Sequence, residues 1–297
     1  MARTTLIAGD WDRRLRRLAW PLLGAAAVLV VLPMLMTLAL AFTDYDALHA
    51  PRFSALDNIR RLWRDDIFHT TLWNSVMFAA IAVPLRLGAS LGCALLFARR
   101  RRGTGIGRAL VYLPTVVPDV SYALLWLWVF NPLYGPLNLL LGAMGLPGPS
   151  WLLSAWGART AIVIMSLFQI GEGFVVALAV RHDIPQELYE LAAIDGVRPS
   201  WTFRRVTLPL MAPALMLLAA RDIVFTFQQT FVPSLVVTEG GPLYATTFLS
   251  LYTYDNAFQF LRFGYASAMT LVMYMVTALM VGAQFLVLRR WRARWEW

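Results

Sequence analysis

Five charged side chains lie inside long apolar stretches of the chain; Arg86 and Asp119 are assigned no role, and each of the other three needs a polar partner or a polar cavity. Glu172 is the single charge of its stretch, and Gln169 lies three residues earlier, on the same face of an ideal helix. Arg221 and Asp222 are adjacent near the middle of the following apolar stretch. Each such charge costs about 2.5–3.5 kcal/mol when a helix enters a membrane, so we expect each one to have a compensating contact.

Two roles are open for these side chains. In the first, Glu172 and Arg221 form a neutral pair that locks two helices together. In the second, polar side chains line a path for a solute, since an amide offers both a donor and an acceptor to a sugar hydroxyl. The candidate path residues are Gln169, Glu172, Arg221, Asp222, Phe227, Gln228 and Gln229. Phe227 either supplies an apolar face for a pyranose ring or packs in the core or against lipid.

The lack of lysine, the single cysteine and the wide separation of the histidines exclude several other chemistries. All 26 basic residues are arginine, so no lysine is present for a Walker A loop or a Schiff base, and any ATP must be bound by another chain. The single cysteine, Cys93, excludes an intramolecular disulfide and a cysteine-rich metal site. The three histidines lie far apart, and no nucleophile is suitably spaced from a base. We therefore expect no catalytic residue, metal or cofactor, which argues against an intramembrane enzyme.

Long apolar stretches must position the candidate residues. Hydrophobic residues make up 59% of the chain and charged residues 14%, against about 45–50% and about 25% in soluble domains. A membrane helix needs about 20 mostly apolar residues, and six stretches qualify. They are approximately 18–42, 72–98, 109–130, 160–180, 206–237 and 263–288. The first stretch is too long for the apolar core of a signal peptide, so it is counted as a span. With all six stretches counted, the sequence predicts an all-α integral membrane protein with six transmembrane helices.

The arginines predict how these helices are oriented. Eighteen fall in the N-terminal segment, in the connections after the second and fourth stretches and in the C-terminal tail, and six fall in the other connections. Because basic loops resist translocation, we expect both termini in the cytoplasm. The same distribution accounts for the net charge of +9 without any binding of nucleic acid.

This topology sets the expected domains. They are a cytoplasmic segment 1–17, a membrane domain 18–288 with a cytoplasmic loop 181–205, and a basic tail 289–297. Trp126 and Trp128 are expected at the outer membrane interface, where tryptophans form an aromatic belt.

The loop 181–205 has the most informative local sequence. Pro185 suits the first turn of a helix, and Glu187 and Glu190 favour the positive end of its dipole. Gly196 suits the C-terminal cap, and Ser200 the N-cap of the next helix. We predict a helix of about ten residues, with small, aliphatic and acidic side chains that suit a groove on a protein partner. An ordinary solvated connector is the alternative.

A longer motif runs through this loop. Its positions are Glu190, Leu191, Ala192, then Gly196 after three residues, Val206 after nine more, and Leu208 and Pro209 after one more. In every spacing this resembles the Glu-Ala-Ala motif of permease subunits in bacterial ATP-binding-cassette importers, which has Ala and Ile where this chain has Leu191 and Val206. Asp195, LPTVVP at 113–118, TEGGP at 238–242 and GYASA at 264–268 resemble its carbohydrate-uptake branch, in the manner of the larger subunit of maltose and glycerol-3-phosphate importers.

The resemblance implies a type I importer permease, a multi-pass protein of the bacterial inner membrane that passes a sugar, oligosaccharide or related polyol. In the family, the loop helix docks in a cleft of a cytoplasmic ATPase, and small Ala192 would allow that close approach. The implied coupling residues are Glu190, Ala192, Asp195, Gly196, Leu208 and Pro209.

The resemblance also implies partners for this chain. They are a second permease subunit in a heterodimer, two cytoplasmic ATPase subunits, an extracytoplasmic solute-binding protein and membrane lipid. The alternative function is a secondary, ion-coupled transporter that works as a homo-oligomer through Glu172 or Asp222, although no repeated half with matching broken helices is visible.

Overall fold

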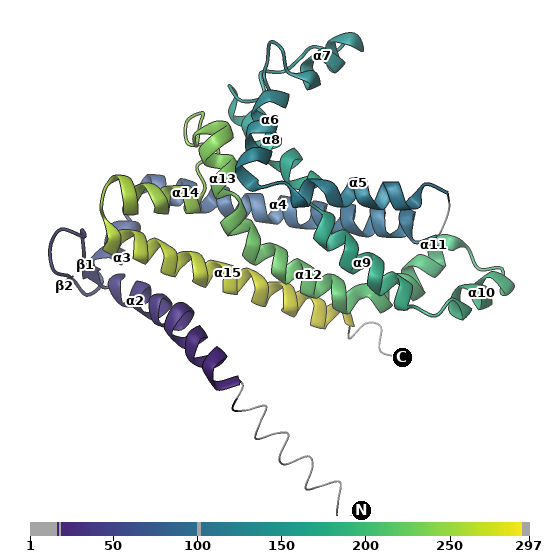
Figure 1. The fold of residues 1–297 in the computed structure, drawn as a ribbon, viewed down its shortest axis with the longest axis horizontal. Helices are drawn as coiled ribbons and strands as arrows, with labels where there is room; N and C mark the ends of the chain where they lie inside the picture. Colours follow the sequence, from purple (N-terminus) through teal and green to yellow (C-terminus); the bar gives the residue numbers. More distant parts are fainter. Residues whose placement is uncertain (1–16, 18, 100–101, 293–297) are drawn as a thin grey trace, which may run out of the picture. The chain divides into compact units, whose positions relative to one another are not determined.

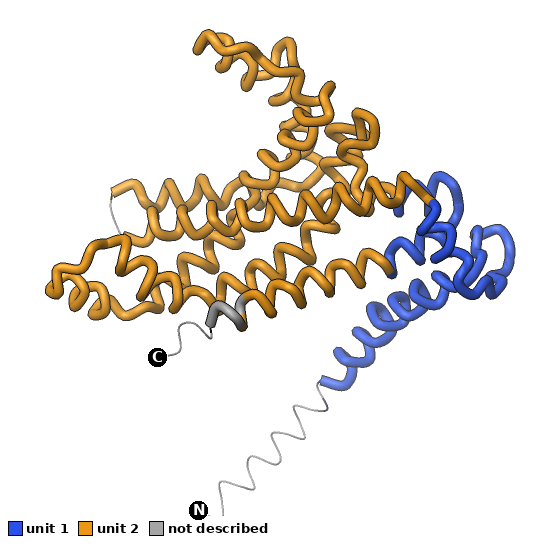
Figure 2. Tube along the Cα trace, turned by 180° about the vertical axis from the view of Figure 1, so that it is seen from behind, with its two compact units in different colours: residues 1–64, 253–271 blue, residues 65–252, 272–297 orange. Residues whose placement is uncertain are grey.

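The computed structural model describes residues 17, 19–99 and 102–292, and these form a mainly helical chain (Figure 1). Residues 1–16 of the expected N-terminal segment and residues 293–297 of the expected tail lie outside the described part. The chain divides into two compact units, which Figure 2 distinguishes by colour: residues 1–64 with 253–271, and residues 65–252 with 272–297.

Three helices form the centre of the second unit. They are α4 (Asp66–Phe97), α9 (Gly171–Asp183) and α12 (Leu208–Gln229), and they lie side by side in Figure 1. Asp65 caps α4, since its side chain accepts hydrogen bonds from the backbone N–H groups of Ile67 and Phe68. The apolar cluster between the helices contains Ala94, Phe174, Ala177, Leu178, Ile184, Met211, Leu215 and Leu218.

The third apolar stretch is a bent pair of helices, where the sequence predicts one continuous span over 109–130. Helix α5 (Thr104–Val116) and helix α6 (Asp119–Val129) meet at 104°. Val117 is extended because the ring of the following Pro118 disfavours the helical conformation there. A short helix, α7 (Pro136–Ala143), follows in the connection to the next span.

The fourth apolar stretch is also broken. Helix α8 (Ala155–Phe168) and helix α9 meet at 44°, with Gln169 and Ile170 between them. The expectation that Gln169 and Glu172 share one face of a single helix is therefore wrong. The backbone N–H of Gly171 donates to Thr115 Oγ1 of α5 over 3.0 Å, and a Cβ at Gly171 would collide with that threonine. Glycine permits the close approach of α9 to α5 that sets the break.

A continuous helical run leads from the loop 181–205 into α12 and beyond it. After α10 (Glu187–Ile194), the run consists of α11 (Pro199–Thr202), the π-helical segment η2 (Phe203–Thr207), α12, α13 (Phe231–Pro233) and the π-helical segment η3 (Ser234–Thr238). α14 (Leu249–Tyr254) follows after a loop.

The first unit contains the remaining elements. They are η1 (Ala27–Val31), α2 (Leu32–Leu40), the antiparallel strands β1 (Thr43–Asp44) and β2 (Arg52–Phe53), α3 (Asp57–Leu62), η4 (Asp255–Gln259) and the beginning of α15 (Phe263–Arg292). Buried Asn58 donates to the carbonyl oxygens of Ala41 and Thr43. Gly264, the first residue of the GYASA pattern, lies so close to the Thr43 carbonyl that a Cβ would collide with it.

Four helices of the described chain are long and apolar enough to cross a membrane, or up to six if each bent pair is one span. The four are Ala19–Leu40, Asp66–Phe97, Pro199–Thr238 and Phe263–Val287.

Hydrogen bonds from α4 and α8 hold the loop between η3 and α14. Asn74 Nδ2 donates to the carbonyls of Tyr244 and Thr247 over 2.8 and 3.2 Å, and Arg159 donates to the carbonyl of Ala245. Within the loop, Glu239, Leu243 and Tyr244 adopt positive φ angles of 50°, 52° and 59°. Such conformations persist only where surrounding contacts enforce them.

We predict that Asn74→Ala lowers the thermal denaturation temperature of the purified protein in detergent. Two carbonyls would lose their donor, at a cost of about 1–3 kcal/mol when such groups stay buried. Thr70→Ala, one turn earlier on α4, is the control, because Thr70 is exposed and its hydroxyl bonds only to Asp66 of the same helix. Equal denaturation temperatures for the two variants would contradict the assignment.

Candidate functional site

Four charged side chains from α4, α9 and α12 meet in one cluster. Arg221 pairs with Glu172. Asp222 Oδ1 lies 3.5 Å from Arg221 Nη1 and 3.6 Å from Arg86 Nη2. Two positive and two negative charges balance, which meets the requirement that charges within apolar helices be compensated. The Glu172–Arg221 contact named from the sequence is therefore present, as part of a larger set.

Exposure changes steeply along this charge cluster. The side chains of Arg86 and Asp222 are 7% and 10% exposed, whereas Glu172 is 51% exposed. An ionic group that is buried within the chain is strongly destabilising when it loses its partner. The Arg86–Asp222 contact is therefore the part of the cluster on which the stability of the fold depends most.

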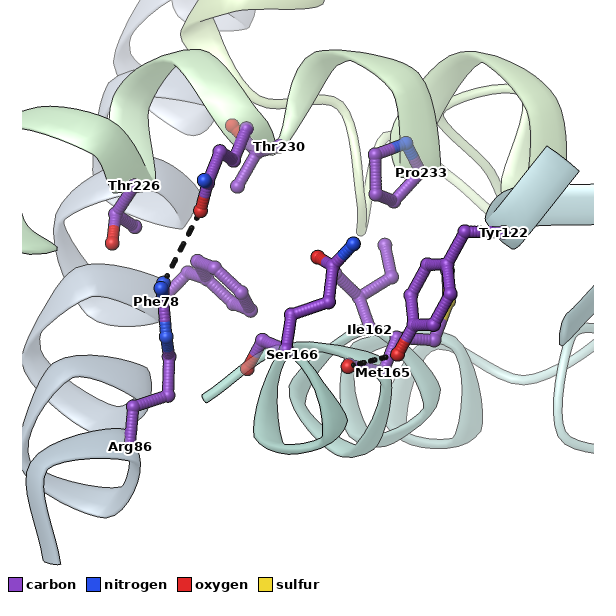
Figure 3. Close-up of a pocket in the computed structure, with 11 residues that line it drawn as sticks. Phe78, Arg86, Tyr122, Ile162, Met165, Ser166, Thr226, Thr230 and Pro233 are labelled. Atoms are coloured by element: carbon purple, nitrogen blue, oxygen red, sulfur yellow. Dashed lines mark hydrogen bonds between the residues drawn. The ribbon is translucent and has the colours of Figure 1, made fainter. Parts of the chain in front are cut away.

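A pocket lined by polar and apolar groups lies beside the buried end of the charge cluster (Figure 3). Arg86 reaches it from α4 on one side and Tyr122 from α6 on the other. Arg86 Nη1 donates to Gln229 Oε1 over 3.4 Å, and the Tyr122 hydroxyl donates to the Met165 carbonyl over 2.7 Å. The lining residues are Phe78, Arg86, Tyr122, Ile162, Met165, Ser166, Gln169, Thr226, Gln229, Thr230 and Pro233.

The pocket includes only some of the path residues predicted from sequence. Gln169 and Gln229 line it, and Gln169 does so from the break between α8 and α9. Phe227 is 3% exposed and does not line the pocket, so its position matches the core alternative. Gln228 is exposed and lies outside the lining.

Sequence reasoning missed Arg86 and Tyr122 as pocket residues. Arg86 carries a usable signal, since it is the single charge of the stretch 72–98 and demands a partner as Asp222 does. Tyr122 carries no such signal, because only the bend before α6 directs it inward. Trp126 is buried against Tyr122, Phe130 and Phe168, whereas Trp128 is 53% exposed.

The helix predicted within the loop 181–205 is α10, and it ends just before Gly196, as the sequence predicts. Gly196 has a positive φ of 65°, and its N–H donates to the Ala193 carbonyl. This left-handed residue ends the helix as a C-terminal cap does. The expected cap from Ser200 is wrong: Pro199 is the first residue of α11, and no side chain caps that helix.

Helix α10 has two different faces. Tyr189 is half-buried and Ala192 is 9% exposed, so both face this chain. Leu188, Leu191 and Ile194, at intervals of three residues, are exposed, as are Glu187 and Glu190. Ala192 is thus packed within the chain, which differs from its expected place against a partner. Leu208 packs on the apolar cluster of the second unit, and Pro209 stands in the first turn of α12.

Comparison with known proteins identifies the class of this chain. Residues 85–293 match the family described as "Binding-protein-dependent transport system inner membrane component". The chain belongs to this family. It is therefore a permease subunit of an ATP-binding-cassette transporter in the inner membrane, as the loop motif implies.

Relatives of the permease match it along most of their length. The probable ABC transporter permease protein YesP of Bacillus subtilis is 33% identical over 84% of this chain and 82% of that protein. The sulfoquinovosyl glycerol transport system permease protein SmoG of Agrobacterium fabrum is 32% identical over 94% of each chain. The trehalose/maltose transport system permease protein MalF of Thermococcus litoralis is 31% identical over 86% of this chain and 87% of that protein.

The permease also shares its fold with a solved transporter chain. A chain of a bacterial ABC transporter involved in the import of the acidic polysaccharide alginate superposes with a TM-score of 0.80 at 21% identity, covering 98% of this chain and 99% of that one. The fold is therefore that of a type I importer permease.

We predict that Arg86→Gln sharply lowers the yield of monodisperse permease in size-exclusion chromatography. The change leaves buried Asp222 with one partner and the charge cluster with a net negative charge, and breaking a buried pair costs about 3–5 kcal/mol. The double variant Arg86→Gln with Asp222→Asn recovers much of the yield. Glu172→Gln has a smaller effect, because Arg221 keeps Asp222 as a partner at 3.5 Å. An equal loss for Glu172→Gln and Arg86→Gln would contradict the exposure argument.

Proposed function

We propose that this permease forms half of the translocation path of an ATP-driven importer and receives its driving force through α10. The observation that carries the proposal is the exposed face of α10, where Leu188, Leu191 and Ile194 lie beside acidic Glu187 and Glu190 outside any candidate span. An apolar stripe with a charged border suits the groove of a protein partner. The motif residues Glu190, Asp195 and Gly196 lie on this helix or in its cap.

The proposed partner at α10 is a cytoplasmic ATPase. The chain has no lysine for a Walker A loop, so a separate chain must bind the nucleotide. We propose two such ATPase subunits, a second permease subunit and an extracytoplasmic solute-binding protein. Support comes from the binding-protein dependence of the family and from a similar alginate transporter in complex with a pentasaccharide-bound periplasmic protein.

The proposed solute is a sugar, an oligosaccharide or a related polyol. Relatives are named as permeases for sulfoquinovosyl glycerol, lactose, trehalose and maltose, and sn-glycerol-3-phosphate. The pocket beside the charge cluster offers an amide, hydroxyls and a guanidinium, which match hydroxyl groups in both donor and acceptor roles. We place Gln169 and Gln229 on the path, together with Arg86 and Tyr122, and Glu172, Arg221 and Asp222 at its border.

The proposed topology has six spans with both termini in the cytoplasm. Each bent helix pair would cross the membrane once, and the predominance of arginine in alternate connections supports this orientation. The membrane domain would extend over 18–288, with 181–205 as its coupling loop and 1–17 and 289–297 as cytoplasmic ends. An ion-coupled transporter is not favoured, because the family is one of binding-protein-dependent transport.

We predict that Leu191→Arg abolishes co-purification of the ATPase with the permease after gentle detergent extraction. The charge would enter the centre of the exposed apolar face of α10, while folding stays intact because Leu191 is 58% exposed. Leu48→Arg, which changes a 74% exposed leucine in an outer loop, is the control and retains the ATPase. Retention of the ATPase by Leu191→Arg would contradict docking through this face.

We also predict that Gly196→Val stops solute uptake while leaving membrane insertion intact. A β-branched residue at a φ of 65° is strained, so the end of α10 must rearrange. Gly103→Val is the matched control, because Gly103 has a φ of 89°, equally open surroundings and a place in a different turn. Uptake assays in vesicles, with immunoblots for insertion, compare the two variants. If Gly196→Val retained the same uptake as Gly103→Val, the cap of α10 would not be required.

A further inference from the structure

One side chain joins α10 to two separate membrane helices. The Tyr189 hydroxyl lies 2.9 Å from Thr207 Oγ1, which belongs to η2 at the entrance of α12. The guanidinium carbon of Arg181, in the last turn of α9, lies 4.1 Å from the centroid of the Tyr189 ring. The ring also packs on the apolar cluster between α4, α9 and α12. Tyr189 therefore contacts the cytoplasmic ends of both α9 and the α12 run.

The two contacts of Tyr189 hold α10 against α9 and against the α12 run, and they are independent of each other. Thr207 is 3% exposed, so its hydroxyl has few alternatives to Tyr189. A guanidinium over an aromatic face is attracted to the ring and does not require the phenol hydroxyl. The hydrogen bond between Gln186 and Glu190, by contrast, joins two positions at the start of α10 itself. The two contacts of Tyr189 can therefore be removed one at a time.

Helices α9 and α12 are also joined by a second contact, farther along both helices from α10. Glu172 stands in the first turn of α9 and pairs with Arg221 of α12. From Arg181 to Glu172 the helix rises about 13 Å, and from Thr207 to Arg221 about 21 Å, at about 1.5 Å per residue. A displacement of α10 that moved α9 and α12 together would reach the charge cluster and the adjoining pocket through both helices.

We propose that Tyr189 is a positioning residue that transmits displacement of α10 to α9 and α12 as one body. This inference rests on the proposed coupling of α10 to an ATPase. It assigns Tyr189 no contact with solute or nucleotide. Its hydroxyl links α10 to the α12 run through Thr207, and its ring links α10 to α9 through Arg181.

The test uses the complete importer, with its ATPase and binding protein, in proteoliposomes. Solute uptake and ATP hydrolysis are measured in parallel, and the readout is solute molecules imported per ATP hydrolysed. Tyr189→Phe removes the hydroxyl and keeps the ring, and Thr207→Val removes the other hydroxyl at similar volume. We expect each variant to assemble normally and to lower the ratio about threefold or more. The controls are Tyr134→Phe and Thr70→Val, at exposed positions away from α10.

Double variants distinguish transmission from general damage. Tyr189→Phe with Thr207→Val should lower the ratio no further than either single change, because both remove one bond. Tyr189→Phe with Arg181→Gln should multiply the two separate losses, because they remove different contacts. An unchanged ratio for Tyr189→Phe would overturn the inference, as would independent losses for Tyr189→Phe and Thr207→Val.

The inference and the proposed function fail in different ways. If Tyr189→Phe loses the ATPase during purification, Tyr189 serves docking and not transmission, and the inference is overturned while the function stands. If the unmodified permease retains no ATPase, both are overturned. Retained ATPase, normal assembly and a lowered ratio would support both.

Discussion

The need to cancel buried charge organises the centre of the second unit. Arg86, Glu172, Arg221 and Asp222 come from three helices, and each charge would be costly in an apolar environment without the others. The buried Arg86–Asp222 contact therefore constrains how α4 and α12 are rotated about their axes, and the Glu172–Arg221 contact joins α9 to α12. The polar pocket lies beside the cluster because the same rotation directs Gln229 and Thr226 inward.

Features set by one or two neighbouring residues could be predicted from the sequence. The end of α10 follows from Gly196, since a left-handed residue there needs only glycine and the preceding helix. The apolar stretches follow from hydropathy: those predicted over 18–42, 72–98 and 263–288 correspond to helices over 19–40, 66–97 and 263–292. The pairing of Glu172 with Arg221, one of the two roles left open by the sequence, followed from the cost of placing either charge in an apolar helix.

Bends and facing directions could not be predicted, because they depend on tertiary contacts. Pro84, Pro114 and Pro213 all lie inside helices, whereas Pro118 begins a new helix after a 104° bend. A proline in a membrane helix is tolerated when neighbours satisfy the freed backbone groups, so its presence alone does not locate a break. The break at Gln169 contains no proline and depends on the close approach of Gly171 to Thr115. Without these bends, the sequence did not indicate that Tyr122 faces the pocket.

The break between α8 and α9 also separates two packing groups. Ala161 and Met165 of α8 pack with Tyr122 and Phe130, and Ile162 of α8 packs with Phe78 and Ala82 of α4, whereas α9 packs with α4 and α12 in a different cluster. Gln169 lies between the two groups and lines the pocket. Because the chain bends by 44° here, α8 packs with Tyr122 and Phe130 while α9 packs with α4 and α12, and the pocket is lined by residues of α6 and α8 as well as by residues of α4 and α12.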